Sequence, residues 1–178
     1  MSTPFLDLGD GVEVRKLEPA DAEEIYAIVG SERERLKARM PWAEGATVET
    51  TRAFIEANVS TNGLDALGIF VGGTYVGGIG IRPDEMEGDC EIGYWIASAH
   101  EGRGLVTAAC RALIDHAFGE LGLHRVTIRV APDNARSRAI PERLGFAHEG
   151  VMREAGRTSL GHNDLVVYGL LDREWTRQ

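Results

Sequence analysis

The sequence predicts one mixed α/β domain that spans residues 1–178. This length suits a single compact fold with a substantial core, and 43% hydrophobic with 26% charged residues is ordinary for a soluble globular protein. Short runs with strand-like alternation of apolar residues are interleaved with longer runs of helical spacing. Because no repeat, linker or low-complexity tract interrupts this pattern, we expect no second domain.

The first half of the chain predicts a strand, three helical segments and a β-hairpin. The expected elements are a strand at residues 12–17, helices at 19–29, 33–40 and 48–59, and strands at 66–71 and 74–81. In the first helix Ile25 and Val29 lie one turn apart, which marks its buried face. Gly72-Gly73 separates the two strand-like runs and is a strong signal for a two-residue hairpin turn.

The second half predicts four more strands, which brings the total to seven. The expected elements are a strand at residues 90–97, a helix at 105–121, a strand at 124–130, a helix at 134–144, and strands at 146–153 and 164–171. The long helix carries an apolar stripe at helical spacing, made of Val106, Ala109, Cys110, Leu113, Ala117 and Leu121. We expect this stripe to face the core.

The charge of the chain is unevenly distributed. The formal net charge is −9, which argues against a general nucleic-acid-binding protein. Residues 103–157 hold nine arginines and six carboxylates, a net charge of +3, so the rest of the chain carries −12. This asymmetry suits an anionic cofactor on one side and an amine-bearing acceptor on the other, although an ordinary solvated charge pattern explains it about as well.

Residues 1–30 show neither a basic stretch nor a long apolar block, and no run has membrane-spanning length, so we expect a cytoplasmic protein without a membrane partner. The two cysteines, Cys90 and Cys110, suggest reduced core thiols rather than a disulfide framework. Four histidines, His116, His124, His148 and His162, lack metal-ligand spacing. We therefore expect no metal site.

A glycine-spaced turn at residues 101–107 follows the strand at 90–97 and opens the long helix. Backbone N–H groups and the helix dipole at such a position hold a phosphate group well. No lysine follows the glycines as a nucleoside-triphosphate loop requires, and Thr107 stands where a dinucleotide fingerprint has its third glycine. The turn therefore indicates a different phosphate-bearing cofactor, although from these residues alone a simple glycine turn is equally plausible.

The order of elements and several motifs together resemble the GNAT superfamily of acyl-CoA-dependent N-acetyltransferases. The motifs are Glu91-Ile92-Gly93-Tyr94-Trp95-Ile96, the glycine turn, Asn134-x-x-Ser137 and Leu144-Gly145-Phe146. Within the superfamily, Met40-Pro41-Trp42, Leu123-His124-Arg125-Val126, Arg143-Leu144-Gly145-Phe146 and Tyr168-Gly169-Leu170-Leu171 resemble the RimJ/RimL-like branch, whose named members acetylate N-termini of ribosomal proteins. The resemblance implies a central twisted, mostly antiparallel sheet of about seven strands, flanked by helices and splayed at the cofactor-binding strands. It also makes a homodimer an expected assembly.

The resemblance implies acetyl-CoA as the cofactor. Its pyrophosphate is expected on the turn formed by Gly102, Arg103, Gly104, Leu105, Val106 and Thr107, and its pantetheine arm against backbone groups of Trp95, Ile96 and Ala97. Asn134, Ser137 and Arg138 complete the expected cofactor contacts. The family pattern has Gln or Arg where Glu101 stands, and Gly or Ala at Val106. We expect the Glu101 carboxylate to face solvent while Arg103 supplies positive charge.

Three residues are predicted to be catalytic. In the strand at 90–97, Glu91 shares a face with Gly93 and Trp95, opposite Cys90, Ile92, Tyr94 and Ile96. By itself Glu91 is typical of an edge or surface position, but the resemblance places it where many members have a general base. It likewise implies that Asn134 orients the cofactor and that Ser137 protonates the departing thiolate, whereas local sequence favours helix caps for both.

Two further residues bear on the expected acid. Tyr168 is an alternative proton donor, although its apolar strand favours core packing. Pro141 lacks the N–H that would bond the carbonyl of residue 137, so we predict a break or kink in the helix beside Ser137.

The function expected from these residues is direct transfer of acetyl from acetyl-CoA to a primary amine in a ternary complex, without an acyl-enzyme. A protein or peptide N-terminal α-amine is the first expectation; small-molecule amines such as polyamines, amino acids or drugs, and a catalytically silent acyl-CoA sensor, are the alternatives. The region of residues 33–62 and a loop near residues 156–163 are expected to select the acceptor. Trp42 is either a wall of the acceptor pocket or a packing anchor.

Overall fold

The computed structural model describes residues 5–59, 64–84, 86–159 and 161–176. A single eight-stranded sheet runs through it in the order β1-β2-β3-β4-β5-β6-β8-β7. The strands are β1 Leu6–Asp7, β2 Val12–Lys16, β3 Leu67–Val71, β4 Thr74–Asp84, β5 Asp89–Ile96, β6 Arg125–Val130, β7 Ala147–Thr158 and β8 Gly161–Leu171. Every neighbouring pair is antiparallel except β5 and β6, which run parallel. The mostly antiparallel sheet is confirmed.

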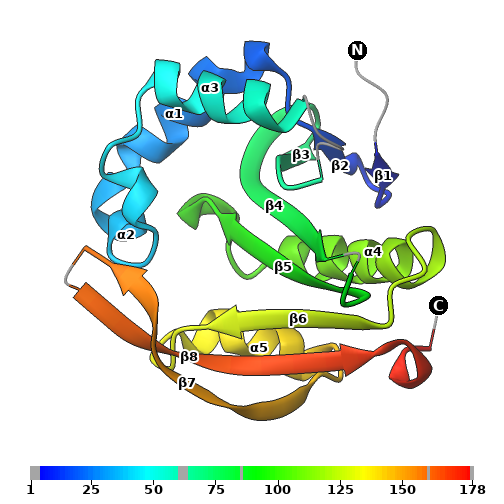
Figure 1. Cartoon of the computed structure of the whole chain (residues 1–178). Helices are drawn as coiled ribbons and strands as arrows, with labels where there is room; N and C mark the ends of the chain where they lie inside the picture. Colours follow the sequence, from blue (N-terminus) through cyan, green and yellow to red (C-terminus); the bar gives the residue numbers. More distant parts are fainter. Residues whose placement is uncertain (1–4, 60–63, 85, 160, 177–178) are drawn as a thin grey trace.

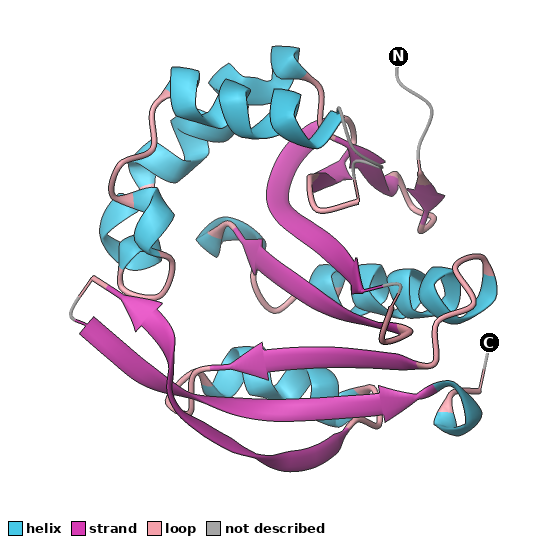
Figure 2. Ribbon diagram, in the orientation of Figure 1, coloured by secondary structure: helices cyan, strands magenta, loops and turns pink. Residues whose placement is uncertain are grey.

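The helices lie on the two sides of this sheet (Figures 1 and 2). They are α1 Ala22–Ser31, α2 Arg33–Lys37, α3 Val48–Val59, α4 Leu105–Gly119 and α5 Ala135–Arg143. Cys90 and Ile92 of β5 share a core with the apolar stripe of α4, whereas Trp95 of the same strand packs with the cluster under α1. The predicted alternation of β5 is therefore confirmed.

The predicted β-hairpin is confirmed. Gly72 and Gly73 both have positive φ, +57° and +81°, and join β3 to β4 with Val71 opposite Thr74. Positive φ at both central residues matches the twist of a tight hairpin and favours glycine.

Several expected element boundaries differ from the structure, among them three with an evident physical cause. A two-residue strand, β1, precedes the first expected strand and is too short to show a pattern. Helix α2 ends at Lys37, because the chain then turns into a 3₁₀ turn at Pro41–Ala43. Residues 156–158 and 161–163, expected to form a loop, belong to β7 and β8, where Gly156 pairs with Asn163; residue 160 of the expected loop lies outside the described residues.

Strands β5 and β6 separate soon after they meet. They pair only from Asp89 opposite Arg125 to Glu91 opposite Thr127, although β5 continues to Ile96 and β6 to Val130. The two ribbons diverge from that point (Figure 2). We call the parts of the two strands that do not pair with each other, residues 92–96 of β5 and 128–130 of β6, the splay. The splay predicted for the sheet is confirmed.

Among the described helices, none is both long and apolar enough to cross a membrane.

Candidate active site

The glycine turn lies between the end of β5 and helix α4. Gly102 and Gly104 have φ of +74° and +78°, a left-handed conformation that glycine adopts without strain. Gly104 is the N-cap of α4 and offers no side-chain acceptor to the helix. The first-turn N–H groups of Leu105, Val106 and Thr107 therefore point out of the helix end, where they and the dipole favour an anion.

The Glu101 carboxylate is expected to face solvent, but in the structure it is bound by two arginines. Its carboxylate is 25% exposed and accepts a hydrogen bond from Arg35 Nη1 at 3.1 Å and another from Arg136 Nη1. Helix α2 and the first turn of α5 thus each contribute one guanidinium that offsets the carboxylate. The side chain of Arg103 is exposed, and its Nη1 lies 2.9 Å from His100 Nδ1.

The edge of β5 that faces the splay is set by its pairing with β4. Ala97 N–H donates to Val76 O at 2.8 Å, so Ala97 is bonded to β4. Because backbone groups alternate along a strand, the peptide groups of Tyr94 and Ile96 point the other way, toward the splay. Ile96 O already accepts a hydrogen bond from Arg35 Nη2 at 2.9 Å. Of the three residues predicted to meet pantetheine, only Ile96 presents its N–H to this edge.

Trp95 lies on the opposite face of β5 from α4. Its ring centroid is 6.2 Å from that of Trp42 and 5.9 Å from that of Tyr75. Trp42 is 51% exposed. The side chain of Trp95 therefore packs under the α1–α3 layer, and Trp42 stands at its outer rim.

Glu91 is the last residue of β5 that pairs with β6, so it lies where the splay begins. Its carboxylate is 24% exposed; Oε2 accepts from Arg129 Nη2 at 2.5 Å, and Oε1 lies 3.4 Å from Arg82 Nη2. Arg82 also donates to Asp65 Oδ1 at 3.0 Å. Glu91 is therefore an ion-paired carboxylate within a row of alternating charges, rather than an isolated carboxyl group in an apolar site.

Asn134 and Ser137 lie together at the start of α5. Asn134 Oδ1 accepts a hydrogen bond from Ser137 N–H at 3.3 Å, so Asn134 caps the helix. Ser137 Oγ donates to the Tyr94 hydroxyl at 3.3 Å, and that hydroxyl donates to Ser137 O at 3.0 Å. Burial raises the pKa of Tyr94 above its ordinary value. Ser137 is thus bound to the side chain of Tyr94, a residue of the β5 part of the splay.

Pro141 stands inside α5, and residues 135–143 remain helical on both sides of it. The predicted break does not appear as an interruption of the helix, and the kink stays a prediction. The missing N–H has a direct counterpart in the structure: Tyr94 supplies the hydrogen bond that residue 141 cannot donate.

Arg138 and Tyr168 bind each other beneath α5. Arg138 Nε donates to the Tyr168 hydroxyl at 2.9 Å, and the hydroxyl donates to Glu142 Oε1 at 2.7 Å. Tyr168 is 1% exposed, which confirms that it packs in the core. Arg138 also donates to Pro132 O. The side chains of Arg138 and Tyr168 therefore both form hydrogen bonds to other groups of the protein.

The two cysteines are buried and free. Burial raises the pKa of the Cys90 thiol to about 12 and also raises that of Cys110. A thiol that stays protonated is a poor nucleophile, so neither cysteine suits an acyl-enzyme.

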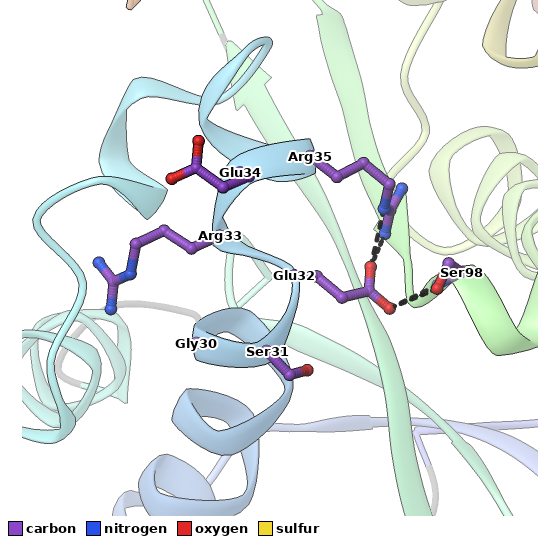
Figure 3. A pocket seen from close by; sticks show the side chains of 7 residues that line it. All are labelled: Gly30, Ser31, Glu32, Arg33, Glu34, Arg35 and Ser98. Carbon is purple, nitrogen blue, oxygen red and sulfur yellow. Dashed lines mark hydrogen bonds and ion pairs between the residues drawn. The ribbon is translucent and has the colours of Figure 1, made fainter.

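An open hollow of about 450 Å³ lies where the helical layer meets the end of β5, lined by residues 30–35 and Ser98. Glu32 lies between Arg35 and Ser98, while Arg33 and Glu34 point away from them (Figure 3). Glu32 accepts from Ser98 N and Oγ, both at 2.8 Å, and from Arg35 Nε at 2.8 Å. We call these three residues the Glu32 clamp, because they tie α2 to the chain just after β5.

Sequence reasoning missed Arg35, Arg136 and Tyr94. Arg35 is 66 residues from Glu101 and Tyr94 is 43 residues from Ser137, so no local pattern links them. The signal available for Tyr94 was Pro141, which predicts a carbonyl in need of a donor.

Known proteins resemble the chain along most of its length. A family model described as Acetyltransferase (GNAT) domain matches residues 12–147. The putative ribosomal N-acetyltransferase YdaF of Bacillus subtilis (strain 168) is 40% identical over 175 residues, covering 94% of this chain and 95% of the relative. A crystal structure of a probable acetyltransferase matches with a TM-score of 0.90 and 39% identity, over 96% of this chain and 98% of that one.

The structure of Mycobacterium smegmatis RimJ in complex with CoA-disulfide matches with a TM-score of 0.85 and 25% identity, over 94% of this chain and 85% of that one. The family model covers well over half of the sequence, and the YdaF match extends over nearly all of it. The chain therefore belongs to the GNAT family of acetyl-CoA-dependent N-acetyltransferases and resembles its RimJ/RimL-like members.

Proposed function

We propose that this enzyme acetylates the α-amino group of a protein or peptide N-terminus. The observation that carries the proposal is the splay of β5 and β6, followed by the N-terminus of α4, which has no side-chain cap. The splay leaves an extended backbone edge, and the helix end leaves free N–H donors. The name of YdaF, a putative ribosomal N-acetyltransferase, supports a ribosomal-protein acceptor.

The chain's own groups fit acetyl-CoA at this position. The N–H groups of Leu105, Val106 and Thr107 would hold its pyrophosphate, with Gly102 and Gly104 leaving room and Arg103 adding charge. The peptide groups of Tyr94 and Ile96 would meet its pantetheine arm, beside Trp95, Ala97 and the α5 residues Asn134, Ser137 and Arg138. RimJ, which shares this fold, has been crystallised with CoA-disulfide.

The choice of an α-amine follows from proton chemistry. When bound, acetyl-CoA supplies a thioester carbonyl that only an unprotonated amine can attack. Removing the proton at pH 7 costs roughly 1.4 kcal/mol for an α-amine with a pKa of about 8, but roughly 4.6 kcal/mol for lysine at about 10.4. A modest base is therefore sufficient for an N-terminus.

Three groups of the chain would serve the transfer. Glu91 takes the amine proton, directly or through a water, while Arg82 and Arg129 hold its carboxylate in place. The N–H of Ile96 donates toward the thioester carbonyl. Ser137 Oγ, which donates to the Tyr94 hydroxyl in this structure, would give its proton to the leaving thiolate instead. Because both thiols are buried, transfer is direct and no acyl-enzyme forms.

The test is thiol release from acetyl-CoA with a panel of amines. The panel contains peptides with free N-termini, the same peptides with blocked N-termini and an internal lysine, and spermidine and free amino acids. A kcat/KM at least about tenfold higher for free N-terminal peptides supports the proposal. Higher kcat/KM for small amines contradicts it in favour of small-molecule acetylation, and acetyl-CoA binding without release by any amine contradicts it in favour of a sensor.

Glu91→Gln tests the proposed base. The amide keeps the size of the side chain and one acceptor for the arginines, but it cannot take a proton. We expect kcat with a good peptide to fall by about 10²-fold at pH 7, with a smaller deficit above pH of about 8, where the amine loses its proton unaided. Steady-state rates across this pH range measure both effects.

Glu149→Gln is the matched control, since Glu149 is paired with Arg125 on a neighbouring part of the sheet. It should leave kcat nearly unchanged. Turnover of Glu91→Gln within a few-fold of wild type at every pH would exclude Glu91 as the base.

A further inference from the structure

Inside helix α5, the carbonyl of Ser137 has no N–H donor within the helix. In a regular helix the N–H of residue 141 would donate to Ser137 O, but Pro141 has no N–H. A partly buried carbonyl without a donor is costly, because it has left water and gained nothing. The Tyr94 hydroxyl fills this role from outside the helix, at 3.0 Å from Ser137 O.

The same hydroxyl also accepts a hydrogen bond from the Ser137 side chain. Tyr94 commits its proton to the carbonyl, so its oxygen is left as an acceptor, and Ser137 Oγ donates to it at 3.3 Å. The two residues thus form a closed pair in which one tyrosine hydroxyl binds both the main chain and the side chain of Ser137. Asn134 fixes the third group of the residue, its N–H.

We propose that Tyr94 is a positioning residue that holds the Ser137 hydroxyl in place by accepting its hydrogen bond until the leaving thiolate replaces Tyr94 as the acceptor, and that Pro141 makes this possible by leaving the Ser137 carbonyl free for Tyr94. The inference rests on the proposed function, because it assumes that Ser137 delivers the proton to the leaving thiolate.

The location of Tyr94 explains why this matters for the reaction. Its peptide group lies on the β5 edge that faces the splay, while its side chain packs with the α4 core. The hydroxyl therefore joins the strand that would line the pantetheine arm to the helix that carries the proposed acid. Burial raises the pKa of Tyr94, which keeps the hydroxyl protonated and able to donate to the carbonyl.

A stability cycle tests the contact itself. Tyr94→Phe removes the donor, so we expect the Tm to fall by about 4 °C. In a Pro141→Ala background the new N–H of residue 141 serves Ser137 O, so Tyr94→Phe should there lower Tm by less than half as much. Equal losses in both backgrounds would mean that Tyr94 does not support this carbonyl.

A kinetic cycle separates the role of Tyr94 in positioning the Ser137 hydroxyl from its role as a donor to the Ser137 carbonyl. Tyr94→Phe should lower kcat about tenfold and leave the KM for acetyl-CoA within about twofold. Adding Pro141→Ala to Tyr94→Phe should restore Tm but not kcat. The new N–H of residue 141 replaces Tyr94 as donor to the Ser137 carbonyl, but nothing replaces Tyr94 as acceptor for Ser137 Oγ. Tyr94→Phe should add little to the loss caused by Ser137→Ala, since it acts through that residue.

Two kinetic outcomes would overturn the proposal: recovery of kcat in the Tyr94→Phe, Pro141→Ala double variant, or full additivity with Ser137→Ala. Tyr26→Phe is the control, since Tyr26 lies on α1, outside the contact between β5 and α5; its kcat should stay unchanged. A wild-type enzyme that releases no thiol with any amine contradicts the proposed function instead, and the stability cycle still reports on the contact.

Discussion

At the scale of single residues, Glu101 is the main departure from the family pattern. A carboxylate beside a phosphate site is unfavourable unless it is compensated. Arg35 and Arg136 compensate it by binding it directly. The cost is that two guanidiniums near the turn are already engaged before an anion arrives.

Glu101→Gln should therefore tighten the binding of acetyl-CoA. The substitution removes a negative charge and releases Arg35 and Arg136 toward the phosphates, so we expect the KM for acetyl-CoA to fall by about three- to tenfold. Glu120→Gln, at the far end of α4, removes an equal charge and should not change KM. A higher KM in Glu101→Gln would show that the carboxylate instead holds the site together.

Single-residue predictions succeeded where they rested on alternation or spacing. The faces of β5 and the stripe of α4 follow from residues two or three to four apart, and both are confirmed. The cap by Asn134 is local and also follows. The partners of the Glu101 carboxylate and of the Ser137 hydroxyl come from remote parts of the chain, which only tertiary packing brings near.

At the scale of elements, the Glu32 clamp ties helix α2 to the end of β5. Burial alone would raise the pKa of Glu32, but hydrogen bonds from Arg35 and Ser98 outweigh it and hold the pKa below its usual 4.5. A carboxyl with a lowered pKa contributes stability above the unfolded-state value and loses it as the pH falls through the folded-state value. The clamp should thus weaken in acid.

The expected result for Glu32→Gln is a loss of stability that depends on pH. At pH 7 the variant should be less stable than wild type by about 1 kcal/mol, and the gap should shrink as the pH falls from 5 to 3, because the wild-type carboxyl becomes protonated. Urea unfolding at each pH measures the gap. Glu34→Gln, two residues further along the chain and 84% exposed, should show almost no gap. A gap for Glu32→Gln that stays constant with pH would rule out the charged clamp.

Elements were predicted well in number and type, and less well at their ends. The Gly72-Gly73 turn, the α4 stripe and the alternation of β5 carry strong local signals. Strand β7 continues beyond residue 153 and β8 begins before residue 164. Cross-strand pairing, with Gly156 opposite Asn163, holds these extra residues together, and no hydrophobic pattern marks them. Glycine and polar residues there suggested a loop.

At the scale of the whole molecule, the order of strands places the site. The single parallel pair, β5 and β6, separates beyond Glu91, and helix α4 connects the two strands. Residue patterns predicted the strands but not their order in the sheet; the resemblance to the GNAT family implied only a mostly antiparallel sheet that splays at the cofactor-binding strands. The positive segment of residues 103–157 includes most of the glycine turn, β6 and α5.

The central claim is that acetyl-CoA lies along the splay with its pyrophosphate on the first turn of α4. The most direct test is a titration of the ¹⁵N-labelled full-length chain with coenzyme A, followed by amide chemical shifts. We predict that the largest changes occur at Tyr94, Ile96, Leu105, Val106 and Thr107. Changes centred instead on the hollow at residues 30–35, or no saturable change at the α4 turn, would contradict the account.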